Sequence, residues 1–241
     1  MRKGVLLLLI LLAMPVAFAD ITITTEQNAH NLGNKIRASA SLLQEDNFEG
    51  LVKLAVLCGS YKLEYFLSPV SLEANFRTAV NIPELVATSS MIGDCTLAGV
   101  LATNDNLIIE QRNSNSFSVT RQLVVLPVDT KITSLPGDII HVNGIVNEAF
   151  GNNLLKATAK VILDNLSYSS DVANGKFNLT LEIPKTIKSG KHTIEISSFD
   201  SKNNFGSSSI EMDITAIPTY VKLDLGSSQI LPGSKVDIAA S

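Results

Sequence analysis

Side chains that could carry out chemistry are few in this chain of 241 residues, and they lie far apart. The histidines His30, His141 and His192 have no Cys, Asp, Glu or second His at a metal-ligand spacing. The sequence also lacks Gly-x-Ser-x-Gly, His-Glu-x-x-His and a phosphate-binding Gly loop. We therefore predict a protein that is not an enzyme and that has no catalytic site, metal site or cofactor.

Cys58 and Cys95 are the only cysteines. A bond between them would close a loop of roughly 37 residues, worth about 4 kcal/mol in the chain-entropy model. The alternative is two free thiols that pack as small hydrophobes. An oxidising compartment favours the disulfide.

The N-terminus bears on that compartment. Arg2 and Lys3 precede an apolar run over Val5–Ala13, and Ala17–Ala19 has the small-x-small pattern of a cleavage site before Asp20. The apolar stretch is shorter than the ~20 residues that span a bilayer. We predict a signal peptide over residues 1–19 and a secreted or cell-surface protein. An uncleaved membrane anchor is the alternative.

Composition limits the remaining chain. It is 45% hydrophobic and 17% charged, with a net charge of −4 and scattered basic residues. Nucleic acid is excluded as a partner, because phosphate binding needs clustered Lys and Arg. Apolar and polar residues alternate with period two, as over residues 177–183 and 210–214, between Gly, Asn, Asp, Ser and Pro. This pattern predicts many short β-strands.

The chain also repeats itself about every 100 residues. Ala74–Pro83 matches Gly175–Pro184 at an offset of 101 residues, and Gly93–Leu97 matches Gly190–Ile194. A further element occurs three times, at Leu32–Ile36, Leu135–Ile140 and Leu231–Val236. Matching elements in the same order indicate an array of similar domains.

The motif Pro-Gly-x-x-Val-x-Val-x-Gly, matched at Pro136–Gly144, is followed by a Gly-Asn turn at Gly151–Leu155 and by Gly190–His192. From about residue 20 onward the chain resembles the immunoglobulin-like and macroglobulin-like domains of prokaryotic cell-surface proteins, archaeal ones included. The first unit departs from the pattern, because it lacks the Pro and has Cys95 in place of the His.

The resemblance implies an all-β fold of tandem immunoglobulin-like β-sandwiches after an N-terminal signal peptide helix. The expected domains are residues 20–126 and 127–217, and residues 218–241 would be the first strands of an incomplete third domain in a truncated reading frame. Their last strands would cover Phe117–Val125 and Ser208–Ala216. Cys58 would end one strand where Cys95 begins its neighbour, as a bridge within one sheet. Leu163 and His192 would occupy the matching positions of the second unit.

Three groups of residues could make contacts outside the fold. Tyr61, Tyr65 and Phe66 could form an exposed contact patch, although such rings more often cover the edge of a core. The turn over residues 200–204 offers oxygen ligands, but Lys202 makes a Ca²⁺ site there a poor expectation. Asn165 and Asn178 lie in Asn-x-Ser/Thr sequons and could carry glycans, although two sequons are near chance for this composition.

The function expected from the sequence is that of an exported, non-catalytic surface protein that serves as a spacer or adhesion module. Its partner would be a cell-surface protein or a polysaccharide, and it would meet the membrane only through the signal segment or a missing C-terminal anchor. The alternatives are the stalk of an exported peptidase or glycoside hydrolase, and a polysaccharide-binding module. The absence of Trp weakens the last of these.

Overall fold

A computed structural model describes residues 19–216, 223–224 and 239–240. Over these residues the chain forms twenty-one strands and one short 3-10 helix, Ser89–Met91, so the predicted all-β fold is confirmed. No helix among them is long and apolar enough to cross a membrane. Most of the predicted signal peptide and of the predicted third domain lies outside the described residues. Of the predicted third domain the structure describes β20 (Leu223–Asp224) and β21 (Ala239–Ala240), which pair with each other.

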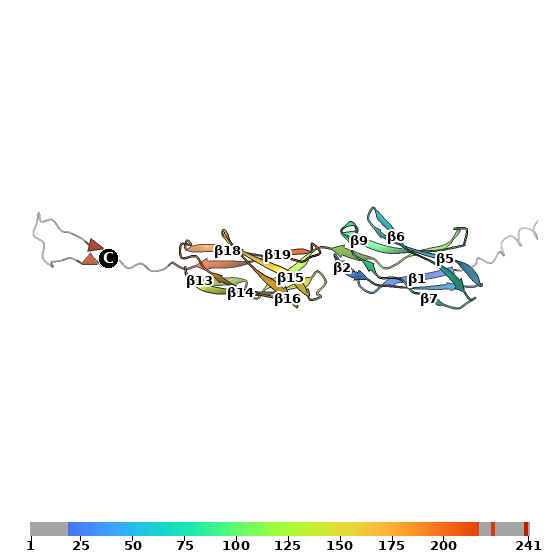
Figure 1. Ribbon diagram of the computed structural model, residues 1–241, viewed down its shortest axis with the longest axis horizontal. Coiled ribbons are helices and arrows are strands. Elements are labelled where there is room, and N and C mark those ends of the chain that lie inside the picture. The colour runs from blue at the N-terminus through green and yellow to red at the C-terminus, as the bar shows by residue number, and fades with distance from the viewer. Residues whose placement is uncertain (1–18, 217–222, 225–238, 241) are drawn as a thin grey trace, which may run out of the picture.

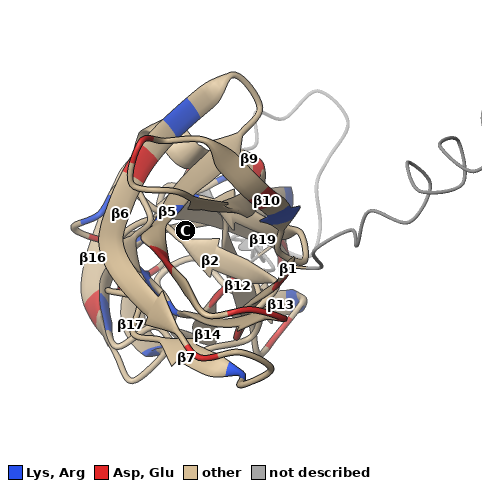
Figure 2. Ribbon diagram, turned by 90° about the vertical axis from the view of Figure 1, so that its right-hand side faces the viewer, with Lys and Arg blue, Asp and Glu red and all other residues tan. Residues whose placement is uncertain are grey.

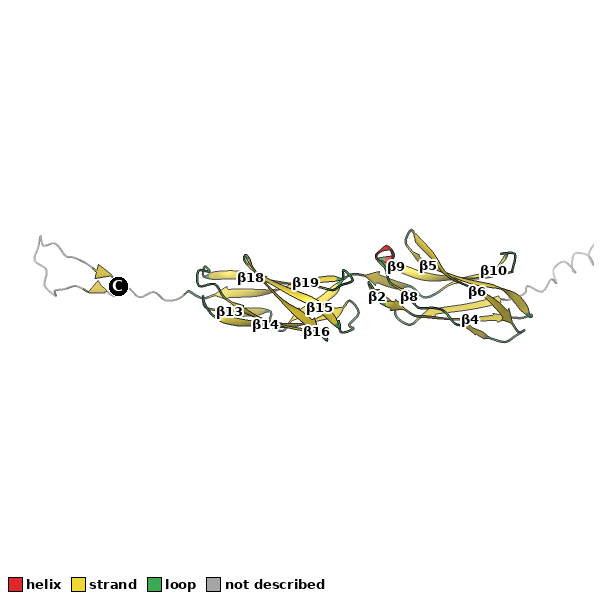
Figure 3. Cartoon of the chain, in the orientation of Figure 1, coloured by secondary structure: helices red, strands yellow, loops and turns green. Residues whose placement is uncertain are grey.

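The first unit packs two layers around one core (Figures 1 and 3). One layer has the order β1-β4-β7 and the other β2-β11-β9-β5-β6, with β10 also paired to β9. The strands are β1 (Ala19–Thr25), β2 (Ala29–Asn31), β4 (Ala38–Gln44), β5 (Phe48–Cys58), β6 (Tyr61–Leu72), β7 (Thr78–Val80), β9 (Gly93–Ala102), β10 (Ile108–Asn113) and β11 (Phe117–Thr120). The short strands β3 (Lys35–Ile36) and β8 (Leu85–Val86) pair with each other.

The second unit has a single sheet path, β12-β14-β17-β16-β15-β18-β19-β13, which folds over its own core. The strands are β12 (Leu123–Pro127), β13 (Lys131–Ser134), β14 (Ile139–Glu148), β15 (Lys156–Leu163), β16 (Leu166–Ala173), β17 (Lys176–Glu182), β18 (Gly190–Phe199) and β19 (Phe205–Ile214). β16 and β17 pair only at Ala173 and Lys176. This point joins the layer β12-β14-β17 to the layer formed by the other five strands.

The period-two pattern explains which side chains build the core. In β17 every second residue is buried, including Phe177 and Leu181, and β15 buries Ala157 to Leu163 in the same alternation. The β16–β17 connection is Asn174-Gly175, and both residues have positive φ, of 50° and 74°. This dipeptide suits a two-residue hairpin turn, since its twist matches that of the flanking strands. Local sequence therefore sets both the strand faces and this turn.

The strand predicted over Phe117–Val125 is wrong as a single element. β11 ends at Thr120 and pairs with β2 and β9 in the first unit, whereas β12 starts at Leu123 and pairs with β14 in the second. The chain thus changes sheet at Arg121 and Gln122, and the boundary predicted between residues 126 and 127 falls within β12. The last strand of the second unit also runs over Phe205–Ile214 rather than Ser208–Ala216.

Candidate functional site

The structure joins Cys58 and Cys95 in a disulfide between directly opposed residues of β5 and β9. Their Cα atoms are 4.2 Å apart, and both residues are buried in the first core. In the second unit Leu163 lies opposite Ile194. The match between the two repeats had predicted His192 at that position. The two units therefore differ by two residues in register here, and a buried Leu–Ile contact stands where the first unit has the disulfide.

The three histidines stay apart. Nδ1 of His141 contacts the Thr180 hydroxyl at 3.1 Å, and Nε2 of His192 contacts the Lys188 carbonyl oxygen at 2.8 Å. The Lys188 carbonyl, and after it Asp164, raise the pKa of His192. Within the described residues no three His, Cys, Asp or Glu side chains lie close enough to hold a metal ion.

His30 differs from the other two histidines because it is buried. It is 2% exposed and packs edge to face on Phe117 at 5.7 Å between ring centroids. Within the described part of the chain neither ring nitrogen has a hydrogen-bond partner of normal geometry. Burial lowers its pKa, while the backbone at Gln27 and the charge of Glu148 act in the opposite direction. Burial therefore disfavours the charged form of this ring, which lines a pocket together with Asn152 of the second unit.

The predicted aromatic patch lies against the first core. Tyr61, Tyr65 and Phe66 are all half-buried and pack on that core. Tyr65 occupies a β-bulge, where the pairing of β5 with β6 skips one residue, and burial raises its pKa to about 12. A bulge changes the side-chain alternation, so Tyr61 and Tyr65 do not follow one regular face. Whether the rings bind a partner stays a prediction.

Both sequon asparagines are accessible. Asn165 lies in the turn between β15 and β16, and Asn178 points outward from β17. A glycan at either position would leave the core undisturbed. Their modification stays a prediction.

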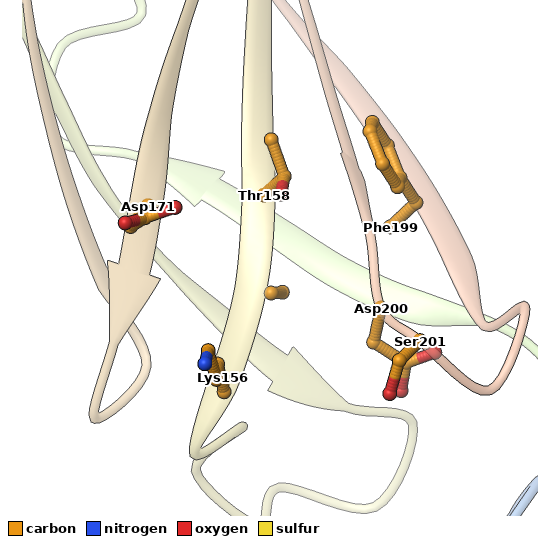
Figure 4. A pocket seen from close by; sticks show the side chains of 7 residues that line it. Lys156, Thr158, Asp171, Phe199, Asp200 and Ser201 are labelled. Atoms are coloured by element: carbon orange, nitrogen blue, oxygen red, sulfur yellow. The ribbon is translucent and has the colours of Figure 1, made fainter.

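A pocket of about 350 Å³ opens on the outer face of the second unit (Figure 4). Asp171 of β16, Thr158 of β15 and Phe199 of β18 lie opposite one another across three neighbouring strands. Lys156, Ala157, Asp200 and Ser201 complete its lining. The sequence did not predict this site, because its lining residues come from three separate segments of the chain. The available signal was Phe199, a large apolar residue at an outward position of its strand.

Asp200 shapes the edge of this pocket. Its carboxylate accepts hydrogen bonds from the Lys202 and Asn204 backbone N–H groups, at 2.8 and 2.9 Å, and from the Asn204 side-chain amide at 2.8 Å. The oxygens that sequence reasoning considered for Ca²⁺ therefore hold the turn together. Asp200 is a positioning group that fixes the β18–β19 connection beside Phe199.

The same turn reaches the first unit. Oδ1 of Asn204 accepts a hydrogen bond from the Leu32 N–H at 3.1 Å, and its amide nitrogen donates to the Leu32 carbonyl at 3.0 Å. Asn31 donates to the Gln122 carbonyl and accepts from the Ala149 N–H, at 2.9 and 3.0 Å. Both asparagines are 1% exposed. We call Asn31, Leu32, Gln122, Ala149 and Asn204 the junction.

Charged residues do not gather into one patch. Figure 2 shows Lys and Arg interspersed with Asp and Glu along the ribbon of both units. Most ion pairs link exposed neighbours, such as Arg77 with Asp20 and Lys35 with Glu84. Exposed pairs of this kind contribute little stability.

No family model and no curated protein matches this chain. Solved structures with some likeness include a bacterial ice-binding adhesin of 1.5 MDa, at 11% identity and a TM-score of 0.34 over 87% of this chain and 69% of that one. A tetra-tandem repeat from the extending region of a large adhesion protein has 13% identity and a TM-score of 0.32, with coverages of 88% and 53%. Escherichia coli α2-macroglobulin has 9% identity and a TM-score of 0.33, over 85% of this chain and 17% of that one.

A β-glucosidase of Erythrobacter marinus is similar at 12% identity and a TM-score of 0.34, over 43% of this chain and 16% of the enzyme. The organisms named are bacteria and give no support to an archaeal origin. The chain spans only a small part of the glucosidase and of the macroglobulin. Similarity at this level assigns no function.

Proposed function

We propose that this chain is an exported, non-catalytic part of a cell-surface protein that acts as a spacer and contact module. The observation that supports it is the junction, which joins two β-sandwich units end to end (Figure 1). Only Arg121 and Gln122 separate the last strand of the first unit from the first strand of the second. A connection this short, tied by buried amides, holds the units at a fixed angle.

Fixed units suit a protein that must keep a distant part away from the cell. A flexible linker would let the units tumble separately, since its end-to-end distance follows random-coil statistics. Here two buried asparagines bond backbone groups of the other unit, and breaking those bonds leaves buried polar groups unpaired. The proposed partner is a cell-surface protein or polysaccharide.

Two measurements test this proposal. Fractionation of cells that carry an epitope-tagged chain should place it in the medium or at the surface, accessible to added protease. Small-angle scattering of the purified chain should give an elongated particle, and a ten-residue Gly-Ser insertion between Arg121 and Gln122 should broaden the distance distribution. A cytoplasmic location, or a scattering curve that the insertion leaves unchanged, would contradict the proposal.

A further inference from the structure

Two phenylalanine rings mark the pocket on the outer face of the second unit: Phe199 lines it, and Phe205 stands beside Phe199. Phe199 and Phe205 are directly opposed across β18 and β19, and they are 44% and 51% exposed. They continue the row that Asp171 and Thr158 begin, so one line of outward residues crosses four strands. Adjacent exposed aromatic residues on a sheet face are candidates for ligand contact rather than for core packing.

Polar groups in the pocket have hydrogen-bonding capacity to spare. Within the described part of the chain, neither Asp171 nor Lys156 takes part in an ion pair or a side-chain hydrogen bond. Asp171 can accept, Lys156 can donate, and the Thr158 hydroxyl can do both. The pocket therefore offers both kinds of hydrogen-bond partner within reach of an exposed aromatic ring (Figure 4).

The next row of the same face is polar. Lys160 of β15 lies opposite Ser169 on one side and Ser197 on the other, and Ser197 lies opposite Ser207 of β19. Four strands span about 14 Å at ordinary strand spacing, which is long enough for a short oligosaccharide lying across them. Lys156 and Lys160 balance the charges of Asp171 and Asp200, so a neutral ligand meets no net charge.

A sugar ring has the matching chemistry, because its C–H face packs on an aromatic ring while its hydroxyl groups donate and accept hydrogen bonds around its rim. An anionic polymer would meet the Asp171 and Asp200 carboxylates. A protein partner of ordinary affinity buries about 800 Å² on each side, which is more than this pocket and the two rings offer.

We propose that the pocket, with Phe199 and Phe205 beside it, binds a neutral polysaccharide. This site deepens the proposed contact role, because it names a neutral polysaccharide as the ligand and places its binding on the second unit. The inference rests on the proposed function only for its setting, since a surface module meets polysaccharides. Binding is measured on the purified chain, so failure of export and failure of binding are separate results.

Affinity electrophoresis of the purified full chain through gels that contain a β-glucan, a xylan or a galactomannan tests the proposal. We expect at least one of these neutral polymers to retard the chain. Phe199→Ala and Phe205→Ala should each weaken that binding at least tenfold, because each removes a stacking surface. Asp171→Asn should weaken it by a smaller factor. Phe150→Ala serves as the matched control, since that ring is 57% exposed but lies outside the row.

Circular dichroism shows whether each variant is folded. Because Phe199 and Phe205 are exposed, their removal should leave the melting temperature nearly unchanged. If either Phe variant is destabilised, the weaker polymer binding expected of Asp171→Asn still tests the site. The proposal fails if no neutral polymer retards the chain, or if the Phe and Asp variants bind as the parent does. The proposal is also contradicted if an anionic polysaccharide such as alginate, or a peptide, binds the chain while no neutral polymer does.

Discussion

At the scale of single residues, His30 combines burial with ring nitrogens that have no hydrogen-bond partner of normal geometry among the described residues. It borders a pocket of about 400 Å³ that also includes Glu26, Lys35 and Arg37 of the first unit and Asn152 of the second. Glu148 acts on it from the second unit and Phe117 packs against its ring. Burial therefore lowers the pKa of the ring, although the charge of Glu148 acts in the opposite direction.

This environment makes stability depend on pH. The pKa of His30 in the folded chain lies below its ordinary value of 6.5, so the unfolded chain binds a proton first as the pH falls. Its contribution to stability is complete above pH 6.5 and is lost as the pH drops below that value. We expect urea unfolding to show a smaller free energy at pH 5 than at pH 7, and His30→Leu to reduce this difference.

His192→Gln is the control, because the pKa of His192 is raised. That residue stabilises the fold below pH 6.5 and loses its effect as the pH rises through its raised pKa. Its removal should therefore steepen the loss of stability in acid. An equal pH dependence in the parent and in His30→Leu would contradict the assignment.

At the scale of elements, the disulfide ties β5 to β9 at the end of the hairpin that β5 forms with β6. β6 is an edge strand of twelve residues, the kind of edge that invites pairing with another chain. The bulge at Tyr65, the ion pair of Lys62 with Glu64 and the position of Pro69 interrupt that edge. The bridge keeps the neighbouring β5 in register while the edge strand stays irregular.

The double variant Cys58→Ala/Cys95→Ala should lose about 4 kcal/mol of stability in the first unit, since the unfolded chain regains the freedom of a long loop. Hydrogen exchange resolved by residue would report this loss in β5 and β9. The amides of β15 and β18 should keep their protection, because they lie in the other unit. Equal exchange in the parent and the variant would show that the bridge adds no stability.

Local patterns in the sequence were enough to predict the fold class and most of the strand faces, but not every strand boundary. Phe177 and Leu181 face the core because they alternate with polar residues, and the two cysteines paired as the resemblance implied. The change of sheet at Arg121 could not be predicted, since β11 and β12 are both apolar and alternate alike. The pocket depends on the register between β15, β16 and β18, which no single strand encodes.

At the scale of the whole molecule, Asn204 links the turn beside the pocket to the first unit. Asn204→Ala removes both bonds to Leu32 and leaves the buried Leu32 carbonyl unpaired, at a cost of about 1–3 kcal/mol, whereas the Leu32 N–H keeps its bond to the Thr120 carbonyl. We expect the two units of the variant to reorient more independently, seen as a broader distance distribution in small-angle scattering.

Ser207→Ala is the matched control, because Ser207 is exposed on the same strand pair and bonds nothing across the junction. It should leave the scattering curve unchanged. If Asn204→Ala scatters as the parent does, the remaining bonds, those of Asn31 and the bond from Asn34 to Glu148, are sufficient to fix the angle between the units.

The disulfide also decides which part of the first unit can carry tension. When the ends of the chain are pulled apart, the load passes directly from Cys58 to Cys95 through the covalent bond. The residues from 59 to 94, with β6, β7 and β8, then lie outside the load path. Even if the unit unravels, its extension is shorter by about 120 Å than that of the reduced chain. A single cut by a protease within that loop would leave the two halves of the molecule tethered.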